Sequence, residues 1–391
     1  MAGAFQTVSG VVPARSPKEI LKNVKLSLPG GGESATLSGT DQEIGVRARL
    51  TEVESSSAGE LLLPTARFGQ ILREVPDDTI ELELTEADGE GAGTLLVRAG
   101  SSEFRLQTED PEQFPDVADF EARVGSGPHV RVPVAVMHEA ISRTIFAVSQ
   151  DSARYALGGV QVEIEGATIT FAATDGRRLA IVTGTCEHVA GEGDESTDTE
   201  GSIKGIVPQK AMQLLDRSLG AAKDSKGEKD DETGPPTVRL AIQQNEVIVD
   251  VGSATIEARL VEGQFPDYRR VVPDGSPKQL DMVTAPLLAA VRQAQIVTSD
   301  ESRGVNFLFD DGTLTLTSAA ADVGRSKVQL PIDYQTDPLE IKFDPKFLVD
   351  FLRVLGPEQA IRVELSDGAR AGVFRAGDDY TYVVMPLEQR R

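Results

Sequence analysis

The sequence predicts an α+β fold made of three copies of one domain, each with two helices packed on antiparallel sheets. One observation is a helical pattern that opens near a proline and recurs about every 140 residues, at 63–73, 207–217 and 343–353. The other is the alternation of apolar and polar residues between these helices, which is typical of strands with one solvated face. The repeat is therefore as long as a domain.

Each repeat is also expected to contain an earlier helix. The pattern is clearest in the middle third, where an apolar stripe at helical spacing consists of Val134, Met137, Ile141, Ile145 and Val148. A stripe of this kind indicates a helix with one face buried against a sheet.

The strand pattern occurs in every third of the chain. Apolar and polar residues alternate at 80–84, 160–164, 238–242 and 314–316. Each repeat is therefore expected to hold about six to eight antiparallel strands.

Two short motifs recur in the same order as the helices. Gly-Thr-Asp at 39–41 matches Ala-Thr-Asp at 173–175, and Phe-Pro-Asp occurs at 114–116 and again at 265–267. In the last third, residues 317–328 fill the first place more loosely, and Tyr-Val-Val-Met-Pro at 382–386 fills the second. We expect three domains, at 1–125, 126–274 and 275–391.

Two stretches of the middle third depart from the repeat. Residues 187–201 and 223–236 are rich in Gly, Asp, Glu or Lys, a composition typical of solvated loops. The simplest interpretation is that these acidic insertions have no specific role.

The composition limits the classes of function. The chain has 62 Asp and Glu against 39 Lys and Arg, and its only cysteine, Cys186, excludes an internal disulfide. The three histidines, His129, His138 and His188, lack metal-ligand spacing, so we expect no metal and no cofactor. No apolar run reaches membrane-spanning length and no signal peptide is evident, so we expect a cytoplasmic protein without a membrane partner.

A net charge of -23 argues against a nucleic-acid partner unless the positive charges are segregated. Placed in register, the three helical segments put Arg73, Arg217 and Arg353 at one position, about 200° from the apolar residue two places earlier. Arg143 and Arg292 form a similar pair on the earlier helix. A solvated helix surface explains any one of these arginines, but the repetition favours a shared role.

At this point the sequence resembles the bacterial DNA polymerase III beta subunit family, the beta sliding clamps. The similarity is most specific in Ala-Thr-Asp-Gly-Arg-Arg-Leu-Ala at 173–180 and Leu-Val-Glu-Gly-Gln-Phe-Pro-Asp-Tyr-Arg-Arg-Val-Val-Pro at 260–273. It is also carried by Ser-Arg-Gly-Val at 302–305 and by residues 382–386, and it extends over essentially the whole chain.

The resemblance implies a ring formed by a head-to-tail homodimer of three-domain chains, with helices lining the hole and sheets outside. It implies a non-catalytic processivity factor that encircles double-stranded DNA without regard to sequence. It further implies as partners the replicative DNA polymerase, the clamp loader and other replication and repair proteins.

By the same resemblance, partner peptides would enter a pocket between the second and third domains. The matching positions are Leu157, Thr174, Gly176, Arg178, Leu179, Pro266, Arg270, Val271, Phe347, Val384, Met385 and Pro386. Apolar walls would hold hydrophobic side chains, and the two arginines would orient polar or carboxylate groups. The alternative is that Thr-Asp-Gly and Phe-Pro-Asp are only turns, which we adopt for Asp41 and Phe114.

The DNA-facing positions implied by the resemblance and the repeat are Arg15, Arg73, Arg143, Arg154, Lys210, Arg217, Arg292 and Arg353. Sliding needs many weak phosphate contacts and no base recognition, so no single residue is expected to dominate.

The chain departs from the family pattern at both ends. After Pro386 the family has an apolar residue and an arginine, whereas here Leu387 precedes Glu388 and three further residues. The family also begins with a strand and a full helix ahead of the segment that matches residues 4–10, whereas this chain starts almost at that point. We therefore expect the first domain to lack an edge strand, with a natural start upstream of Met1.

Two other classes of function remain to be compared with a clamp. A hydrolase or transferase would need a phosphate-binding glycine loop, a histidine-based triad or a metal cluster, and none is evident; Gly-Glu-Gly-Ala-Gly at 89–93 lacks the Lys-Ser/Thr that follows in a P-loop. A monomeric peptide-binding scaffold that never encircles DNA stays open, and its oligomeric state would distinguish it.

Overall fold

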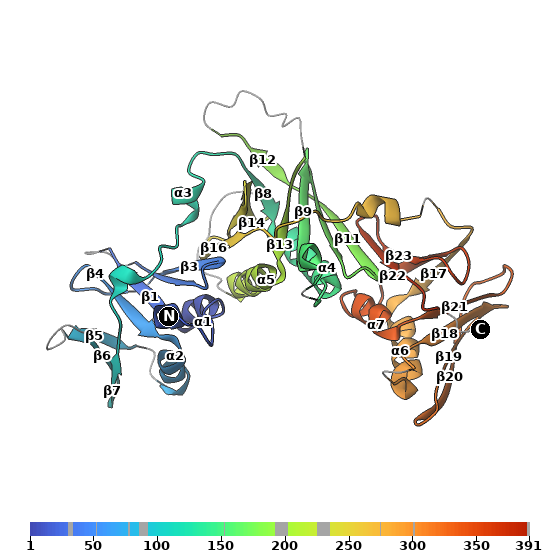
Figure 1. The fold of residues 1–391 in the computed structure, drawn as a ribbon, viewed down its shortest axis with the longest axis horizontal. Coiled ribbons are helices and arrows are strands. Elements are labelled where there is room, and N and C mark those ends of the chain that lie inside the picture. The colour runs from blue at the N-terminus through green and yellow to red at the C-terminus, as the bar shows by residue number, and fades with distance from the viewer. Residues whose placement is uncertain are drawn as a thin grey trace. The chain divides into compact units, whose positions relative to one another are not determined.

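The computed structural model describes residues 1–388 except for 30–33, 52, 77–78, 86–92, 152, 192–201, 225–234, 274 and 300–301. Two compact units make up the chain (Figure 1). The first consists of residues 1–135, 186–200 and 210–260, and the second of 136–185, 201–209 and 261–391. The middle repeat thus contributes strands to both units.

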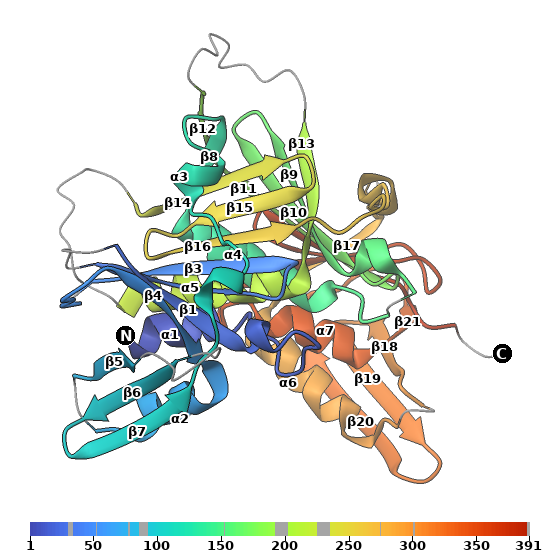
Figure 2. The same cartoon turned by 60° about the vertical axis from the view of Figure 1, so that its left-hand side comes forward.

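The first unit is built on a nine-stranded antiparallel sheet, seen nearly face-on in Figure 2. Its strand order is β12-β8-β14-β15-β16-β3-β2-β1-β4. The bounds are β1 (Asn23–Leu28), β2 (Ala35–Thr40), β3 (Ile44–Leu50), β4 (Gly59–Pro64), β8 (His129–Pro133), β12 (Glu187–Val189), β14 (Thr237–Gln243), β15 (Glu246–Asp250) and β16 (Ala254–Arg259).

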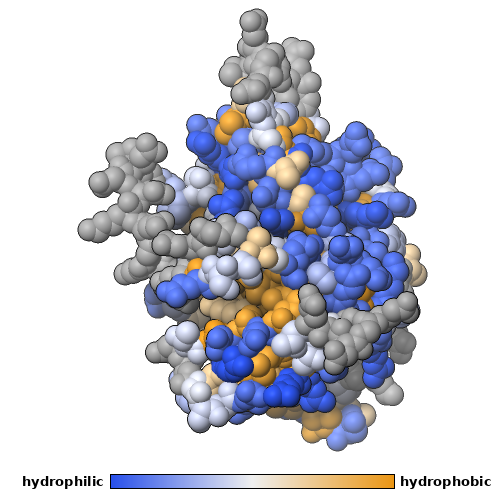
Figure 3. Space-filling model, turned by 90° about the vertical axis from the view of Figure 1, so that its left-hand side faces the viewer, coloured by the Kyte–Doolittle hydropathy of each residue, from blue (hydrophilic) through white to orange (hydrophobic). Residues whose placement is uncertain are grey.

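A three-stranded sheet completes this unit: β5 (Glu81–Thr85), β6 (Thr94–Ala99) and β7 (Ser102–Gln107). Cross-strand register places Leu82, Val97 and Phe104 on one face, and the central Val97 is fully buried. Leu84 on the outer strand is 46% exposed. Within the described residues, β5 and β7 each have one neighbouring strand, so both are free edges. Figure 3 shows an apolar area on the side of the first unit that faces the viewer there.

The second unit has an eight-stranded antiparallel sheet in the order β13-β9-β10-β11-β24-β23-β22-β17 and a four-stranded sheet in the order β20-β19-β18-β21. The bounds are β9 (Gly159–Glu165), β10 (Thr168–Thr174), β11 (Arg178–Thr185), β13 (Ile203–Pro208), β17 (Lys278–Val283), β18 (Val305–Asp310), β19 (Thr313–Ala320), β20 (Gly324–Pro331), β21 (Leu339–Phe343), β22 (Ala360–Leu365), β23 (Gly372–Ala376) and β24 (Tyr380–Val384).

Helices form where the periodic patterns predict them. The bounds are α1 (Ala2–Ser9), α2 (Thr65–Glu74), a short α3 (Phe120–Arg123), α4 (Val134–Thr144), α5 (Gln209–Asp224), α6 (Thr284–Ala294) and α7 (Pro345–Arg353). Helix α7 illustrates the local cause: Asp344 caps it by accepting from the Lys346 N–H at 3.0 Å, and Pro345 occupies its first turn. Its apolar stripe, which includes Phe347 and Phe351, is buried.

Strands from different repeats join within each large sheet. In the first unit, β16 of the middle repeat pairs with β3 of the first repeat. In the second unit, β24 of the last repeat pairs with β11 of the middle repeat. The two junctions are equivalent, because β3 and β11 each follow a Thr-Asp turn and β16 and β24 each close a repeat.

The Thr-Asp motif folds identically in its two copies. Thr40 and Thr174 each donate from Oγ1 to the carbonyl four residues later, at 2.8 and 2.6 Å. Asp41 and Asp175 each accept from two backbone N–H groups of their own turn. These bonds close within a few residues, so the sequence alone specifies this turn.

The expected α+β fold with repeated helices and antiparallel sheets is confirmed. Of the expected acidic loops, most of 187–201 and 223–236 lies outside the described residues. Where it is described, the loop prediction was wrong at residues 187–189, which form β12 on the edge of β8, and at residues 223–224, which end α5. Among the described helices, none has the length and apolar character needed to cross a bilayer.

Candidate functional site

The second unit brings together the turn before β11, the 3-10 turns η4 (Tyr155–Leu157) and η5 (Tyr268–Val271), helix α7 and the segment after β24. The turn is held by its own polar groups. Besides the bonds of Thr174 and Asp175, the Gly176 N–H donates to Thr174 Oγ1 at 3.0 Å. Gly176 has φ +86, a left-handed backbone conformation that favours glycine.

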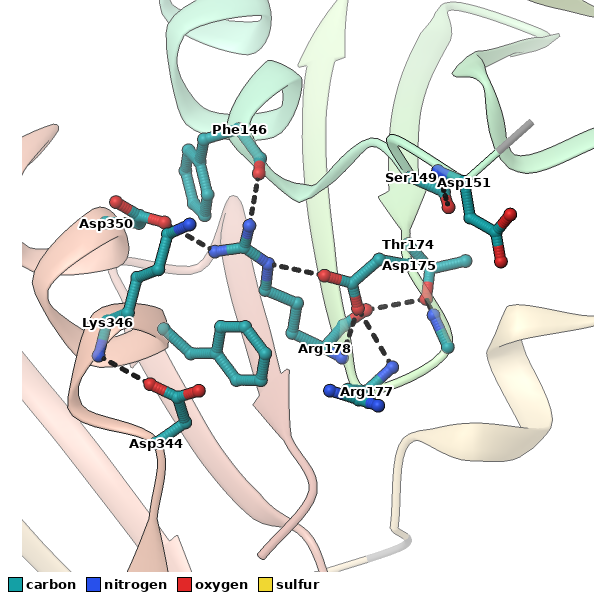
Figure 4. A network of polar contacts seen from close by, with 12 residues as sticks. Phe146, Ser149, Asp151, Thr174, Asp175, Arg177, Arg178, Asp344, Lys346 and Asp350 are labelled. Atoms are coloured by element: carbon teal, nitrogen blue, oxygen red, sulfur yellow. Dashed lines mark hydrogen bonds and ion pairs between the residues drawn. The ribbon is translucent and has the colours of Figure 1, made fainter. Parts of the chain in front are cut away.

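Arg178 is the centre of this site (Figure 4). Its guanidinium donates to Asp175 at 3.0 Å, to Asp350 on α7 at 2.7 Å and to the Phe146 carbonyl at 2.5 Å. It also lies 4.6 Å from the Phe347 ring centroid and 5.3 Å from that of Phe146. Arg178 therefore fastens the turn to α7 with contacts on both its edge and its faces.

Burial by itself would lower the pKa of Arg178, but Tyr382, Asp350 and Asp175 outweigh that effect and raise it. The guanidinium is thus firmly charged although only 8% of Arg178 is exposed. Nearby, burial raises the pKa of Asp344, with the Lys346 N–H, Arg303 and Lys346 acting against it. The charged groups of this site therefore interact with other groups of the protein.

A cluster of apolar side chains lies beside the turn. Leu179, Phe265 and Tyr268 are buried in it, and the half-buried Leu157 packs against it. The ring centroids of Phe265 and Tyr268 are 6.2 Å apart in an edge-on arrangement. The cluster supports η5, and Val271 at the end of η5 remains 47% exposed.

The C-terminal segment continues the pairing of β24. The Met385 N–H donates to the Arg177 carbonyl and the Leu387 N–H donates to the Lys342 carbonyl, both at 2.8 Å. Met385 is 44% exposed. We call Leu157, Val271 and Met385 the apolar rim; these three apolar side chains of the region are half-buried or exposed.

The predicted pocket residues lie in this region but differ in accessibility. Pro266, Gly176, Arg270, Val271 and Met385 are exposed, and Leu157 and Pro386 are half-buried. Thr174, Arg178, Leu179, Phe347 and Val384 are buried. Val384 is 0% exposed, so its inclusion as a contact residue was wrong: its side chain faces the interior of the second unit.

The two predicted arginines have different roles. The Arg178 guanidinium donates to partners inside the protein, and the expectation that it orients polar or carboxylate groups of a ligand stays a prediction. The Arg270 side chain is 87% exposed, and its Nε lies 2.8 Å from a carboxylate oxygen of Asp267. Because this ion pair is exposed, a ligand carboxylate can take the place of Asp267.

Sequence reasoning missed three residues of the site. Asp350 and Phe146 fix Arg178, and Tyr155 is 70% exposed beside Leu157. No local signal marks Asp350, which at about 100° per residue falls on the polar side of α7, outside the buried stripe that includes Phe347 and Phe351. No local signal marks Phe146, because it contributes a backbone carbonyl.

Most of the residues expected to face DNA lie on the protein surface, and their contact with DNA stays a prediction. Arg15, Arg73, Arg154, Arg217, Arg292 and Arg353 are exposed. Arg154 also donates to the Asp175 carbonyl at 2.8 Å. The half-buried Lys210 donates to Asp41 at 2.6 Å and to the Val11 carbonyl at 3.0 Å, and so holds parts of the first unit together.

Arg143 corrects one of these expectations. It is 6% exposed, pairs with Glu139 and with Asp379 at 3.2 Å, and lies 5.0 Å from the ring centroid of Tyr380. The helical periodicity placed it away from the core, but the turn after β23 covers it. Arg143 is therefore a packing residue of the second unit.

A cavity of about 600 Å³ lies on the other side of η5. It is lined among others by Glu163, Thr170, Ile181, Tyr268, Arg269 and Arg375. None of the predicted pocket residues lines it. Among the described residues, no cluster of His, Cys, Asp and Glu could hold a metal ion.

Comparison with known proteins gives a uniform result. Three family models of the DNA polymerase III beta subunit match the chain: the N-terminal domain at 1–118, the central domain at 131–267 and the C-terminal domain at 269–388. The beta sliding clamp of Pseudomonas aeruginosa is 30% identical over 386 residues, which cover 98% of this chain and 96% of that protein. The beta sliding clamp of Chlamydia muridarum is 27% identical over 389 residues, covering 99% and 96%.

Solved structures agree. The DNA polymerase III subunit beta from Pseudomonas aeruginosa matches with a TM-score of 0.82 and 29% identity, covering 99% of this chain and 97% of that one. The sliding clamp from Bacillus subtilis matches with a TM-score of 0.84 at 21% identity, covering 100% and 97%, and this similarity concerns the fold alone.

Proposed function

This chain belongs to the DNA polymerase III beta subunit family, the beta sliding clamps, and we propose that it encircles duplex DNA as a head-to-tail homodimer. In this role it tethers the replicative DNA polymerase to the template. The activity is mechanical and requires no catalytic group or cofactor.

The repeated strand junction is the observation that carries this proposal. Within the chain, β16 pairs with β3 and β24 pairs with β11. One strand of each kind is left over among the described residues: β7, equivalent to β16, and β20, equivalent to β3 and β11. Pairing β7 of one copy with β20 of another repeats the same junction, and two copies close a ring without free edges at these strands.

The positive charges support an enclosed DNA duplex. Arg73, Arg217 and Arg353 are exposed at one equivalent position on α2, α5 and α7, although the chain carries a net charge of -23. Arginines spaced along helices can contact phosphates weakly and without sequence preference, which allows sliding. The acidic remainder of the surface disfavours binding to the outside.

The apolar rim supports a peptide-binding role. Leu157, Val271 and Met385 offer apolar surface around a rigid turn, and Met can adapt to different side chains. Arg270 beside them offers an exposed positive charge to a peptide carboxylate. A short linear segment with apolar side chains and one acidic group fits this chemistry.

Further parts of the proposal follow from family membership. The clamp loader and other replication and repair proteins are proposed to use the same rim. The cytoplasm is the proposed location, and 1–125, 126–274 and 275–391 are the proposed domains.

The test is a titration of a labelled peptide, copied from the C-terminal tail of the replicative polymerase of the same genome, against full-length protein. Deletion of residues 385–391 removes the Met385 side chain and the Leu387 backbone bond, and should weaken binding about a hundredfold. Deletion of 388–391 alone keeps both and serves as the matched control. Equal affinity for both truncations would place the peptide site elsewhere.

A further inference from the structure

The 3-10 turn η5 lies between two different surfaces of the second unit. Its first two residues, Tyr268 and Arg269, line the cavity on one side. Its last two, Arg270 and Val271, are exposed, and Val271 belongs to the apolar rim. Whatever fixes the first pair therefore also orients the second pair.

Glu163 on β9 fixes the first pair. Its Oε2 accepts from the Tyr268 hydroxyl at 3.0 Å and lies 2.9 Å from an Arg269 nitrogen, and its Oε1 accepts from Arg269 at 3.3 Å. Ser202 donates to Oε1 at 3.3 Å. The Glu163 side chain is 6% exposed, so one buried carboxylate holds two consecutive residues of η5.

The electrostatics show that the carboxylate stays charged. Burial alone would raise the pKa of Glu163, but the hydrogen bonds from Arg269 and Tyr268 outweigh it and lower the pKa below its usual value of 4.5. Correspondingly, the Glu163 hydrogen bond is the largest cause of the raised pKa of Arg269. A buried charge with this many donors has one favoured geometry.

The geometry of a 3-10 turn transmits this constraint. Side chains in such a turn project about 120° apart, so the directions of two consecutive residues determine that of the next. With Tyr268 buried and Arg269 held on the cavity side, Arg270 must point to solvent. Val271, three positions after Tyr268, projects from the same side of the turn as Tyr268, and at the end of η5 it is 47% exposed.

We propose that Glu163, through Tyr268 and Arg269, is a positioning residue that orients Arg270 and Val271 for partner peptides. This inference rests on the proposed function of the apolar rim. Glu163 itself lies among buried groups and on the cavity side of η5, so it acts without touching the peptide.

The test uses full-length protein and the labelled polymerase-tail peptide. Glu163→Gln removes the charge but keeps an acceptor for Tyr268, and Arg269→Gln breaks the same pair from its exposed side without disturbing a core position. Each substitution should weaken peptide binding about three- to tenfold. The matched control is Glu165→Gln: Glu165 lies two residues along β9, 73% exposed and 4.0 Å from Arg269, and its loss should leave affinity unchanged.

A double-mutant cycle distinguishes positioning from general destabilisation. In a Val271→Ala background the rim contact is already lost, so adding Glu163→Gln should weaken binding further by less than about twofold. Hydrogen exchange of residues 268–272 without peptide should be faster in Glu163→Gln and unchanged in Glu165→Gln. Dimer mass should be the same in all variants.

The proposal is overturned if Glu163→Gln binds the peptide as tightly as the parent protein, or if its effect is fully additive with Val271→Ala. Failure of the proposed function would look different. In that case either the parent protein would not bind the peptide, or the parent and the 385–391 deletion would bind it equally well. The exchange rates of 268–272 report on η5 in either case.

Discussion

The Arg178 guanidinium on β11 lies 2.7 Å from the Asp350 carboxylate on α7, although the two residues are 172 positions apart in the chain. Their side chains are 7% and 20% exposed. This ion pair, with the pairing of β11 and β24, ties the middle repeat to the last one. The rim that we assign to partner binding is formed at that joint.

Loss of the Arg178–Asp350 ion pair should lower stability more than substitution of an exposed neighbouring residue does. Arg178→Met leaves Asp350 and Asp175 without their cation, and we expect the free energy of unfolding of the second unit to fall by about 3 kcal/mol. Thermal unfolding of the full-length protein measures this. Arg177→Met changes an exposed arginine of the same turn and is expected to have little effect; an equal loss in both variants would contradict the role of Arg178.

The helix arginines should control the lifetime of the protein on DNA. Replacing Arg73, Arg217 and Arg353 by Glu is expected to speed loss of loaded protein from circular DNA and to reduce the steepness of its salt dependence, because fewer counterions are released. The control replaces Arg259, Arg362 and Arg370, exposed arginines outside the helices, at the same change in charge. If both triples behave alike, net charge rather than position determines retention.

Ile296 should contribute to the contact between two copies. It is 74% exposed in η6 (Gln295–Val297), which contacts β19 and the free-edge strand β20. Ile296→Asp is expected to weaken dimerisation about tenfold or more, because it puts a charge in place of an apolar side chain that the dimer contact would bury. Analytical ultracentrifugation measures the dimer equilibrium.

Val283→Asp is the matched control for Ile296. Val283 is 42% exposed at the other end of α6, whose 11 residues span about 16 Å. Its substitution should leave the dimer intact. A dimer that survives Ile296→Asp unchanged would remove η6 from the interface.

Glu257 on β16 should make the first unit less stable as the pH rises. Burial raises its pKa above the usual 4.5, with Arg123 opposing and Glu246 and Asp116 adding to the shift. The folded state then binds a proton more tightly than the unfolded state, so stability decreases as the pH rises from 4.5 through the folded pKa. Glu257→Gln is therefore expected to unfold at a higher temperature than the parent at pH 7.

The advantage of Glu257→Gln should shrink as the pH is lowered toward and below 4.5, because the parent carboxyl becomes protonated first in the folded state and then also in the unfolded state. Glu246→Gln tests specificity, because Glu246 also lies near Arg123, at 3.8 Å, but is 32% exposed. A pH-independent difference between Glu257→Gln and the parent would show that Glu257 is not the titrating group.

The sequence predicted best what is decided locally. The Thr40-Asp41 and Thr174-Asp175 turns are closed by hydrogen bonds within four residues, and their repetition was evident before the fold was known. The capped helix α7 and the alternating strands belong to the same class. In these elements the spacing of apolar side chains predicts which face is buried, without information from the rest of the chain.

What the sequence could not predict depends on residues far apart in the chain. Arg143 was expected on a solvated helix face, but its partner Asp379 comes from a turn 236 positions later. Val384 was expected in the pocket, but pairing with Arg178 across β11 and β24 directs its side chain inward. Periodicity describes one helix or strand and carries no information on what covers it.

The most direct test of the central claim is retention on DNA of different topology. The protein is loaded by its clamp loader onto a nicked circular plasmid, separated from free protein by gel filtration, and the plasmid is then linearised with a restriction enzyme. A closed ring stays on the circle and slides off the linear form within minutes, with no change in salt or sequence. Retention that is equal on circular and linear DNA, or absent from both, would contradict the proposal that this chain encircles the duplex.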